Sequence, residues 1–309
     1  MSRRRKPGGS SLDVVQRLQQ RVSEGEFYEA LQLYKTSYSR LKAQGKLDDA
    51  EELITTGAIA MSKENELNAA TELGLLLVKS YEENDREVDE ARLSQLKRAA
   101  VAMTPGVEMS EFLKRAIRWT RHTKSDAAYE LRLIMARSAV ATDNLAEAAR
   151  YFAVSGCPTE YAALVKQWSA KGYPGERDLF VCRAVLHTLS YNRTEDAAVL
   201  FDSCAAWMLE GDGASGSDGV SSGQAMLESP LSHFTRFVIE LCQVKALMGS
   251  SSAEMVGAFN KLREVYRASI DRDMNLEELL NRIGDVQFGI KPPQEGGLMG
   301  MLGQLLGGM

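Results

Sequence analysis

Residues 25–62 hold two helical hydrophobic patterns separated by a short break, and this pair constrains the fold more than any other feature. In both patterns, residues 27–41 and 47–59, apolar side chains recur at steps of three and four residues, which places them on one stripe of a helix. Gln44 and Gly45 stand between them. Two such helices form an αα-hairpin whose apolar face needs a further hairpin to cover it. The sequence therefore predicts that the hairpin is repeated.

A loose motif marks the repeats. A turn residue is followed four residues later by an acidic residue and then by alanine at Gly25, Gly45 and Asn192, and the copy that starts at Asn144 is one residue shorter. The helix dipole favours negative charge in the first turn, and alanine lets a neighbouring helix come close. Similar patterns follow, including single helices over 126–143 and 253–270. We predict an all-α fold, a right-handed α-solenoid of stacked helical hairpins of the tetratricopeptide-like kind.

Composition divides the chain into four parts. Residues 1–10 are predicted to be a disordered basic tail, with a nuclear-import patch as the alternative. Residues 11–154 and 155–290 are predicted to form the N-terminal and C-terminal halves of the solenoid. Within the second half, residues 211–229 are rich in Gly, Ser and Asp, which predicts a long mobile loop. Residues 291–309 are predicted to be a flexible tail rich in Gly, Leu and Met.

Charge and hydropathy narrow the class of protein. The 309 residues are 44% hydrophobic and 26% charged, which is typical of a globular chain, and the formal net charge is -5. A negative chain is a poor match for nucleic acid, whose phosphates call for a basic surface. No apolar stretch approaches the roughly 20 residues of a membrane-spanning helix. The basic start has no apolar segment behind it, so it does not resemble a secretory signal. We expect a soluble cytosolic protein.

The cysteines and histidines are scattered along the chain. The four cysteines are Cys157, Cys182, Cys204 and Cys242. None belongs to a CxxC pair or has a histidine at ligand spacing, which predicts buried, inert thiols in a reducing compartment. His122, His187 and His233 are too dispersed to predict a metal site. Asn192 begins an N-x-T pattern that would not be glycosylated in the cytosol.

Two short motifs resemble ligand-binding motifs, but the residues around them do not fit either motif. The glycines within 211–216 satisfy GxGxxG, but a helix precedes them and a serine-rich stretch follows, whereas the dinucleotide motif needs a strand and then a helix. Asp271 and Asp273 imitate the start of a calcium loop, but Leu276 and Arg282 occupy the positions of its glycine and its bidentate glutamate. We therefore predict no cofactor, no metal and no catalytic residue, and we expect a binding scaffold rather than an enzyme.

Three segments of the chain resemble the Golgi-to-ER-traffic protein four family. They are EGEFYEALQLYKTSYSRLKAQGKLDDAEELITTGA near the start, KGYPGERDLFVCRAVLHTLSYNRTEDA in the middle and YRASIDRDMNLEELLNRIGDVQFGIKPP near the end. The resemblance runs in order from about Leu12 to Pro293, and the Gly-Leu-rich tail is also similar. It implies an all-helical solenoid that acts as a non-enzymatic adaptor in the delivery of tail-anchored proteins to the ER membrane after translation.

The resemblance implies that the N-terminal half docks the ATPase that carries the transmembrane segment. The implied contacts lie in the hairpin over 27–60 and the helix after it. They are Arg40 and Glu72, with Tyr28, Tyr34 and Lys35 as further candidates. Glu72 stands where the family more usually has aspartate. From the residues alone, solvated charges on a helix face explain Arg40 and Glu72 equally well.

The resemblance also implies that the C-terminal half binds the N-terminal segment of a ubiquitin-like protein or, in animals, a larger chaperone scaffold. The implied region is the loop over 211–229 and the helix that carries Phe234, Phe237 and Leu241. In the family this loop region forms a hairpin-like clasp, so the resemblance adds a short β-hairpin as the alternative to a mobile loop over 211–229. Aromatic residues at helical spacing also suit a core, so the residues alone leave both roles open.

Two other functions remain as alternatives at this point. The first is a generic helical-repeat subunit of another large cytosolic assembly, of the proteasome-lid or signalosome type. Such subunits commonly end in a winged-helix module with a small β-sheet, and no strands are predicted after Ile270. The second is a small-molecule enzyme, which would need polar side chains that converge on a pocket.

Overall fold

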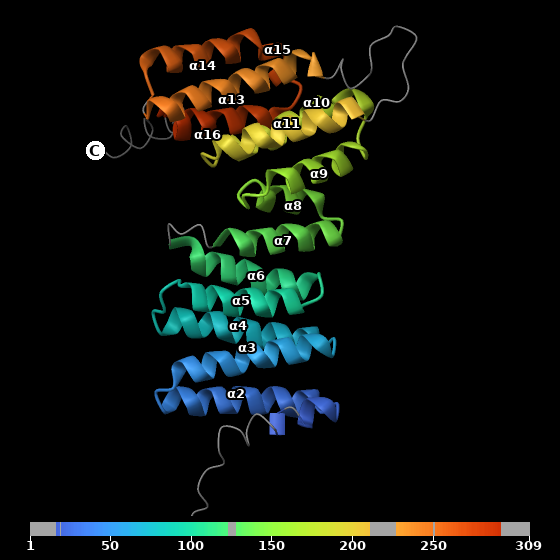
Figure 1. The fold of residues 1–309 in the computed structure, drawn as a ribbon, viewed down its shortest axis with the longest axis vertical. Helices are drawn as coiled ribbons and strands as arrows, with labels where there is room; N and C mark the ends of the chain where they lie inside the picture. The colour runs from blue at the N-terminus through green and yellow to red at the C-terminus, as the bar shows by residue number, and fades with distance from the viewer. Residues whose placement is uncertain (1–16, 19, 123–127, 211–226, 250, 292–309) are drawn as a thin grey trace, which may run out of the picture. The chain divides into compact units, whose positions relative to one another are not determined.

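The structure is a computed structural model that describes residues 17–18, 20–122, 128–210, 227–249 and 251–291 (Figure 1). In these ranges every regular element is an α-helix or a 3-10 helix, and none is a strand. The predicted all-α solenoid of helical hairpins is confirmed. The chain divides into two compact units between Tyr151 and Phe152. Residues 1–16, 292–309 and most of the predicted loop, 211–226, lie outside the described residues.

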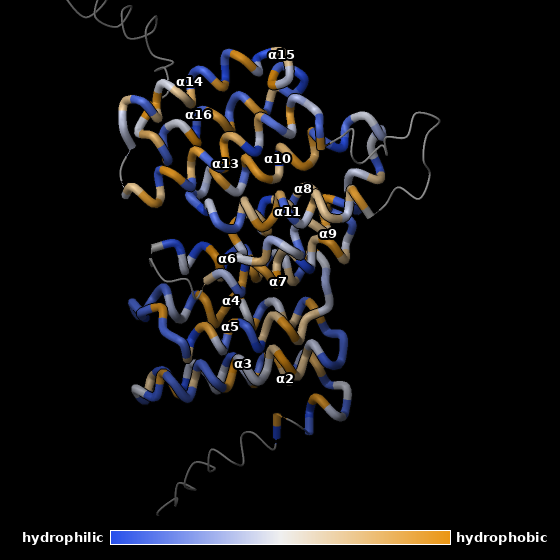
Figure 2. The backbone as a smooth tube through the Cα atoms, turned by 45° about the horizontal axis from the view of Figure 1, so that its top comes forward, coloured by the Kyte–Doolittle hydropathy of each residue, from blue (hydrophilic) through white to orange (hydrophobic). Residues whose placement is uncertain are grey.

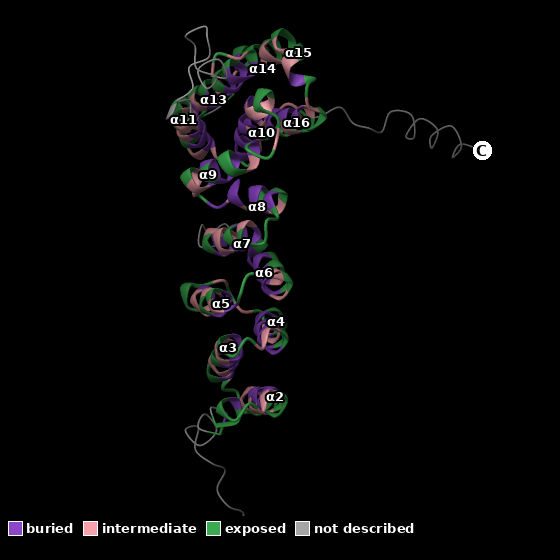
Figure 3. Cartoon of the chain, turned by 90° about the vertical axis from the view of Figure 1, so that its right-hand side faces the viewer, coloured by how far each residue is buried: buried purple, intermediate pink, exposed green. Residues whose placement is uncertain are grey.

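The N-terminal unit is a stack of antiparallel helices in two layers. Its helices are α2 (Phe27–Ala43), α3 (Leu47–Lys63), α4 (Leu67–Glu83), α5 (Glu90–Ala102), α6 (Val107–Trp119) and α7 (Tyr129–Ala141), with a 3-10 helix η1 (Thr120–His122) after α6 and with α8 (Leu145–Phe152) at the boundary. Helices α2, α4 and α6 form one layer, and α3, α5 and α7 form the other (Figure 3). The buried residues face one another between the layers, as the helical periodicity predicts.

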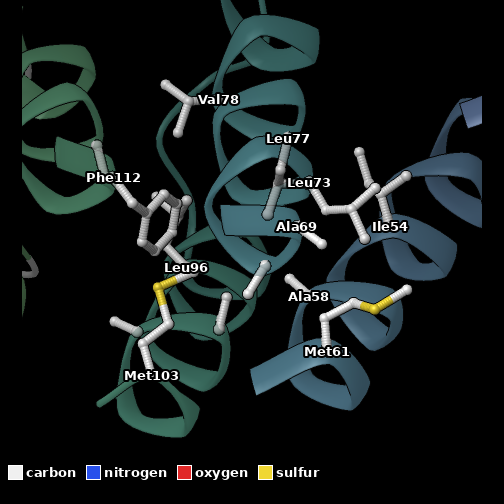
Figure 4. Packing of buried hydrophobic residues seen from close by; sticks show 14 of the residues in the cluster. Ile54, Ala58, Met61, Ala69, Leu73, Leu77, Val78, Leu96, Met103 and Phe112 are labelled. Atoms are coloured by element: carbon white, nitrogen blue, oxygen red, sulfur yellow. The ribbon is translucent and has the colours of Figure 1, made fainter. Parts of the chain in front are cut away.

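The core of this unit runs continuously from helix to helix. Ile54, Ala58 and Met61 on α3 face Ala69 and Leu73 on α4 (Figure 4). All of these except Ala69 are completely buried. On the far side of α4, the ring of Phe112 from α6 packs so closely that a Cβ added at Gly74 would stand 2.8 Å from its Cδ2 atom. Each helix therefore covers the apolar face of the one before it.

Five of the turns between helices repeat one backbone pattern. A residue with φ between 57° and 77° ends one helix, and the fifth residue after it is a completely buried alanine in the next. The turn residues are Gly25, Gly45, Asn65, Asp143 and Asn192. The matching alanines are Ala30, Ala50, Ala70, Ala148 and Ala197. Only glycine, asparagine and aspartate occur at the turn, because these residues tolerate the left-handed region best.

Two details of the predicted pattern are wrong. The turn residue before α8 is Asp143 and not Asn144, so this copy has the full spacing. Asn144 instead caps the helix, since its Oδ1 accepts the N–H of Glu147 at 3.3 Å. The single helix predicted over 253–270 is interrupted at Tyr266, whose ring contacts the rings of Phe234 and Phe237 at centroid distances of 5.6 and 6.4 Å.

The C-terminal unit is built around α10. Its elements are α9 (Pro158–Ser169), the 3-10 helix η3 (Pro174–Glu176), α10 (Arg177–Leu189), α11 (Thr194–Glu210), α13 (Pro230–Met248), α14 (Ala253–Val265), α15 (Arg267–Ile270) and α16 (Met274–Phe288). Helices α9, α11, α13 and α16 all pack on α10. Along these helices hydrophobic and hydrophilic residues alternate in short runs, as expected of helices buried on one side (Figure 2).

Two ion pairs join the start of α16 to α10. Arg183 Nη2 lies 2.6 Å from Asp273 Oδ2, and Arg272 Nη1 lies 2.7 Å from Asp178 Oδ2. Burial alone would raise the pKa of the Asp273 carboxyl, but hydrogen bonds from the Asn275 N–H and from Arg183 outweigh it and lower that pKa. At the other end of α16, Gln287 Nε2 donates to Leu189 O at 3.3 Å. Helix α16 is thus held to α10 at both ends.

The thiols have the buried environment that the sequence predicts, apart from the half-buried Cys157. Burial raises the pKa of Cys182, Cys204 and Cys242 to about 12. At pH 8 such a thiol is ionised to roughly one part in ten thousand. We expect these three to react with a disulfide reagent at least ~100-fold more slowly in the native protein than in guanidinium, with Cys157 reacting first. A time course of reagent release checks this, and four native thiols that react at one common rate would contradict it.

Candidate functional site

Two surfaces follow from the residues that the resemblance singles out, one on each unit. The first lies along α2 and α4. We define the α2–α4 seam as Tyr28, Lys35, Lys42, Glu72 and Glu83. The second lies on α13, and we define the α13 stripe as Phe237, Leu241, Val244, Leu247 and Met248. The seam is charged and the stripe is apolar, so the two would suit different kinds of partner.

Heptad spacing builds the seam. Tyr28, Lys35 and Lys42 are seven residues apart, so they lie on one line along α2. Lys35 forms an ion pair with Glu72 of α4, and Lys42 Nζ lies 3.0 Å from Glu83 Oε2 of the same helix. These contacts connect residues 37 and 41 positions apart, across two helices that belong to the same layer.

Electrostatics at the seam favours the ionised forms. The hydrogen bond with Glu83 raises the pKa of Lys42, and the hydrogen bond from Lys42 lowers the pKa of Glu83. Tyr28, at the start of this line, is 70% exposed. The seam is therefore an array of alternating charges beside an exposed ring, already ordered before any partner arrives.

Arg40 does not belong to the seam. It is exposed, and it lies five residues after Lys35, which places it roughly 140° around the axis of α2. Its side chain makes no ion pair within the described residues, unlike Lys35 and Lys42. The structure thus brings Lys35 and Glu72 together and leaves Arg40 on another side of the same helix.

Two of the predicted contact residues are core residues, and the prediction of a surface role for them is corrected. Tyr34 is only 3% exposed, because its ring lies on the backbone of α3 where Gly57 has no side chain; a Cβ there would be 2.7 Å from the ring. Phe234 is completely buried beside Tyr266. Neither can touch a partner without unpacking its unit.

The α13 stripe includes the other two predicted residues. Phe237 is 42% exposed and Leu241 is half-buried, and three exposed apolar residues follow them toward the end of the helix. The sequence prediction stopped at Leu241. Val244 and Met248 continue its row at steps of three and four, so the pattern alone contained the signal for a longer surface.

Neither a metal-binding cluster nor a membrane-spanning helix occurs among the described residues. No three or more His, Cys, Asp or Glu side chains among them are grouped so that they could hold a metal ion. None of the described helices is both long and apolar enough to cross a bilayer.

Comparisons with known proteins agree on one family. The family model described as Golgi to ER traffic protein 4 matches residues 44–306. The Golgi to ER traffic protein 4 homolog of Oryzias latipes is 29% identical over 299 residues, which covers 95% of this chain and 86% of the relative. The homolog of Homo sapiens is 28% identical over 309 residues, which covers 97% and 88%. The crystal structure of C. therm. Get4 has the same fold, with a TM-score of 0.76 at 22% identity over 96% of both chains.

Proposed function

The chain belongs to the Golgi to ER traffic protein 4 family, and from that premise we propose that it is a non-enzymatic adaptor in the delivery of tail-anchored proteins to the ER membrane. The N-terminal unit binds the cytosolic ATPase that targets these proteins, and the C-terminal unit binds a ubiquitin-like or chaperone-scaffold partner. The observation that carries the proposal is the presence of two surfaces of different chemistry, a charged one and an apolar one, on separate units.

In this proposal the adaptor makes and breaks no bond. It holds two partners on one chain, which raises their effective concentration and turns transfer of the client into a local event. A charged contact at α2 and the seam would form quickly and weaken with salt. An apolar contact on the α13 stripe would set the lifetime of the other complex, since most affinity differences lie in the dissociation rate.

Reversing the charge of Arg40 tests the N-terminal assignment. Arg40→Glu is expected to weaken ATPase binding by about tenfold or more, because a like-charge contact costs on the order of 1.4 kcal/mol or more. Binding of the ubiquitin-like partner should stay at the wild-type level. Titration calorimetry with each purified partner measures both affinities.

Arg118→Glu supplies the matched control. Arg118 is also an exposed arginine of the N-terminal unit, in the last turn of α6, and it forms no ion pair within the described ranges. This variant should bind both partners normally. An equal loss of both partners in Arg40→Glu, or an equal ATPase loss in both variants, would argue against a separate ATPase site around Arg40.

The proteasome-lid or signalosome alternative finds no support in the C-terminal unit. A winged-helix module would place a small β-sheet near the end of the chain. Over residues 271–291 the structure has one helix, α16, and no strand. No observation favours that assignment over the adaptor.

A further inference from the structure

The α13 stripe is a row of apolar side chains open to water. Phe237 and Val244 are each 42% exposed, and Leu247 and Met248 are 88% and 67% exposed. Contiguous rows of this kind mark contact surfaces, because each Å² removed from water is worth about 25 cal/mol. We infer that the chain's own C-terminal segment, Gly296–Met309, docks on this stripe and covers it.

The described chain ends beside the same end of α13. Lys245, between Val244 and Leu247, donates from Nζ to Gln287 Oε1 in the last turn of α16 at 3.5 Å. α16 then stops at Gly289 in the left-handed conformation, and the N–H of Ile290 donates to Gly284 O at 2.9 Å. The last described residue, Lys291, is four residues from the contact with Lys245. The described chain therefore ends close to the stripe.

The composition of the segment fits an apolar surface. Residues 296–309 contain no charged residue. Its apolar residues repeat at spacings of four, three and four, and four residues of the stripe repeat in the same way. These are Leu298, Leu302, Leu305 and Met309 in the segment, and Phe237, Leu241, Val244 and Met248 in the stripe. A segment with this spacing presents one apolar face when it is helical, and such a face is what an exposed apolar row on a helix can bind.

The connection between the two is long enough. The seven residue steps from Lys291 to Leu298 span up to ~23 Å when extended, at about 3.3 Å each. The stripe from Phe237 to Met248 is ~16 Å long, at 1.5 Å per residue. A short tether gives a millimolar effective concentration, so a contact of about 5.5 kcal/mol would keep the stripe covered roughly nine-tenths of the time. A second copy of the chain has no tether, so it would need a higher affinity to cover the stripe to the same extent.

Docking of the segment would also affect the partner. Phe237 and Leu241 belong to the proposed C-terminal partner surface, so the segment must leave before a partner can bind there. This competition rests on the proposed function, whereas the docking rests only on the stripe and on the segment.

Photo-crosslinking of the full-length chain tests the docking. Leu302→p-benzoylphenylalanine is irradiated with no partner present, and the crosslinked peptides are identified by mass spectrometry. The expected crosslinks lie within residues 237–248, and a mixture with an isotope-labelled copy should show them within one molecule. Adding Val244→Asp and Leu247→Asp should lower their yield at least ~10-fold, because the apolar contact would then bury two carboxylates.

Met274→Asp is the matched control for the aspartate changes. Met274 is a 90% exposed apolar residue at the opposite end of α16 from Gln287, so the yield should be unchanged. Crosslinks to other regions, crosslinks only between copies, or a yield that resists the double change would each overturn the inference. Because the sample contains no partner, such a failure would leave the proposed adaptor function untouched.

Discussion

Arg86→Met is expected to lower the free energy of unfolding of the N-terminal unit by about 3–5 kcal/mol. Arg86, in the turn between α4 and α5, reaches back to α3, where its Nη2 lies 3.0 Å from Glu51 Oε2 and its Nε lies 3.2 Å from Oε1. The Glu51 side chain is only 2% exposed, and its one further side-chain partner in the structure as described is the Ser80 hydroxyl at 3.0 Å. Without Arg86, a buried carboxylate would lose its counter-charge. Hydrogen exchange with mass spectrometry measures the loss in this unit separately.

Two companion variants isolate the cause. Arg98→Met breaks the pair with Glu52, in which both side chains are 47% exposed, so it should cost no more than about 1 kcal/mol. Glu51→Leu combined with Arg86→Met removes both charges and should recover much of the stability lost in Arg86→Met alone. If Arg86→Met lowered the free energy of unfolding no more than Arg98→Met does, the buried Glu51 carboxylate would not depend on the charge of Arg86, and the prediction would be wrong.

Arg272→Met is expected to destabilise the C-terminal unit by about 3 kcal/mol. The variant should lose affinity for a partner at the α13 stripe and keep its affinity for the ATPase. Arg272 holds both oxygens of Asp178, at 2.7 and 3.1 Å, and the Asp178 side chain is 2% exposed. Asp178 lies in the first turn of α10, where the helix dipole would still stabilise its negative charge in the absence of Arg272. The loss of stability should therefore fall at the lower end of the range for buried pairs. Hydrogen exchange in α16 and affinities for both partners check the result.

Arg267→Met provides the comparison for Arg272→Met. Arg267 also pairs with an aspartate near the start of α16, but both side chains are more than half exposed, so the change should be almost silent. If Arg272→Met lost both partners together, the assignment of one partner to each unit would be wrong.

Much of the fold could be predicted because its signals are local. Helical periodicity and turn residues lie within a few positions of one another, so the hairpins were visible in the sequence. The turn before α8 was misplaced by one residue because asparagine suits both a left-handed turn and a helix cap, and the sequence does not say which role Asn144 takes.

The candidate surfaces were harder to predict because they depend on contacts between distant residues. An aromatic residue at helical spacing has the same pattern whether it is buried, as Tyr34 and Phe234 are, or exposed, as Tyr28 and Phe237 are. The pair of Lys42 with Glu83 joins positions 41 residues apart, so no local pattern predicts it. Only the stacking of α4 against α2 creates the seam.

The constant five-residue interval between turn residue and buried alanine, which five turns share, limits how the length of this chain can change. One extra residue inside that interval would rotate the following helix by about 100°, which would carry the alanine out of the close contact and bring a larger side chain toward it. The rotated helix would also displace the next hairpin, since each helix packs on the one before it. Insertions and deletions in related chains should therefore collect between the hairpins and at the two ends, and the intervals should keep their length even where their residues differ.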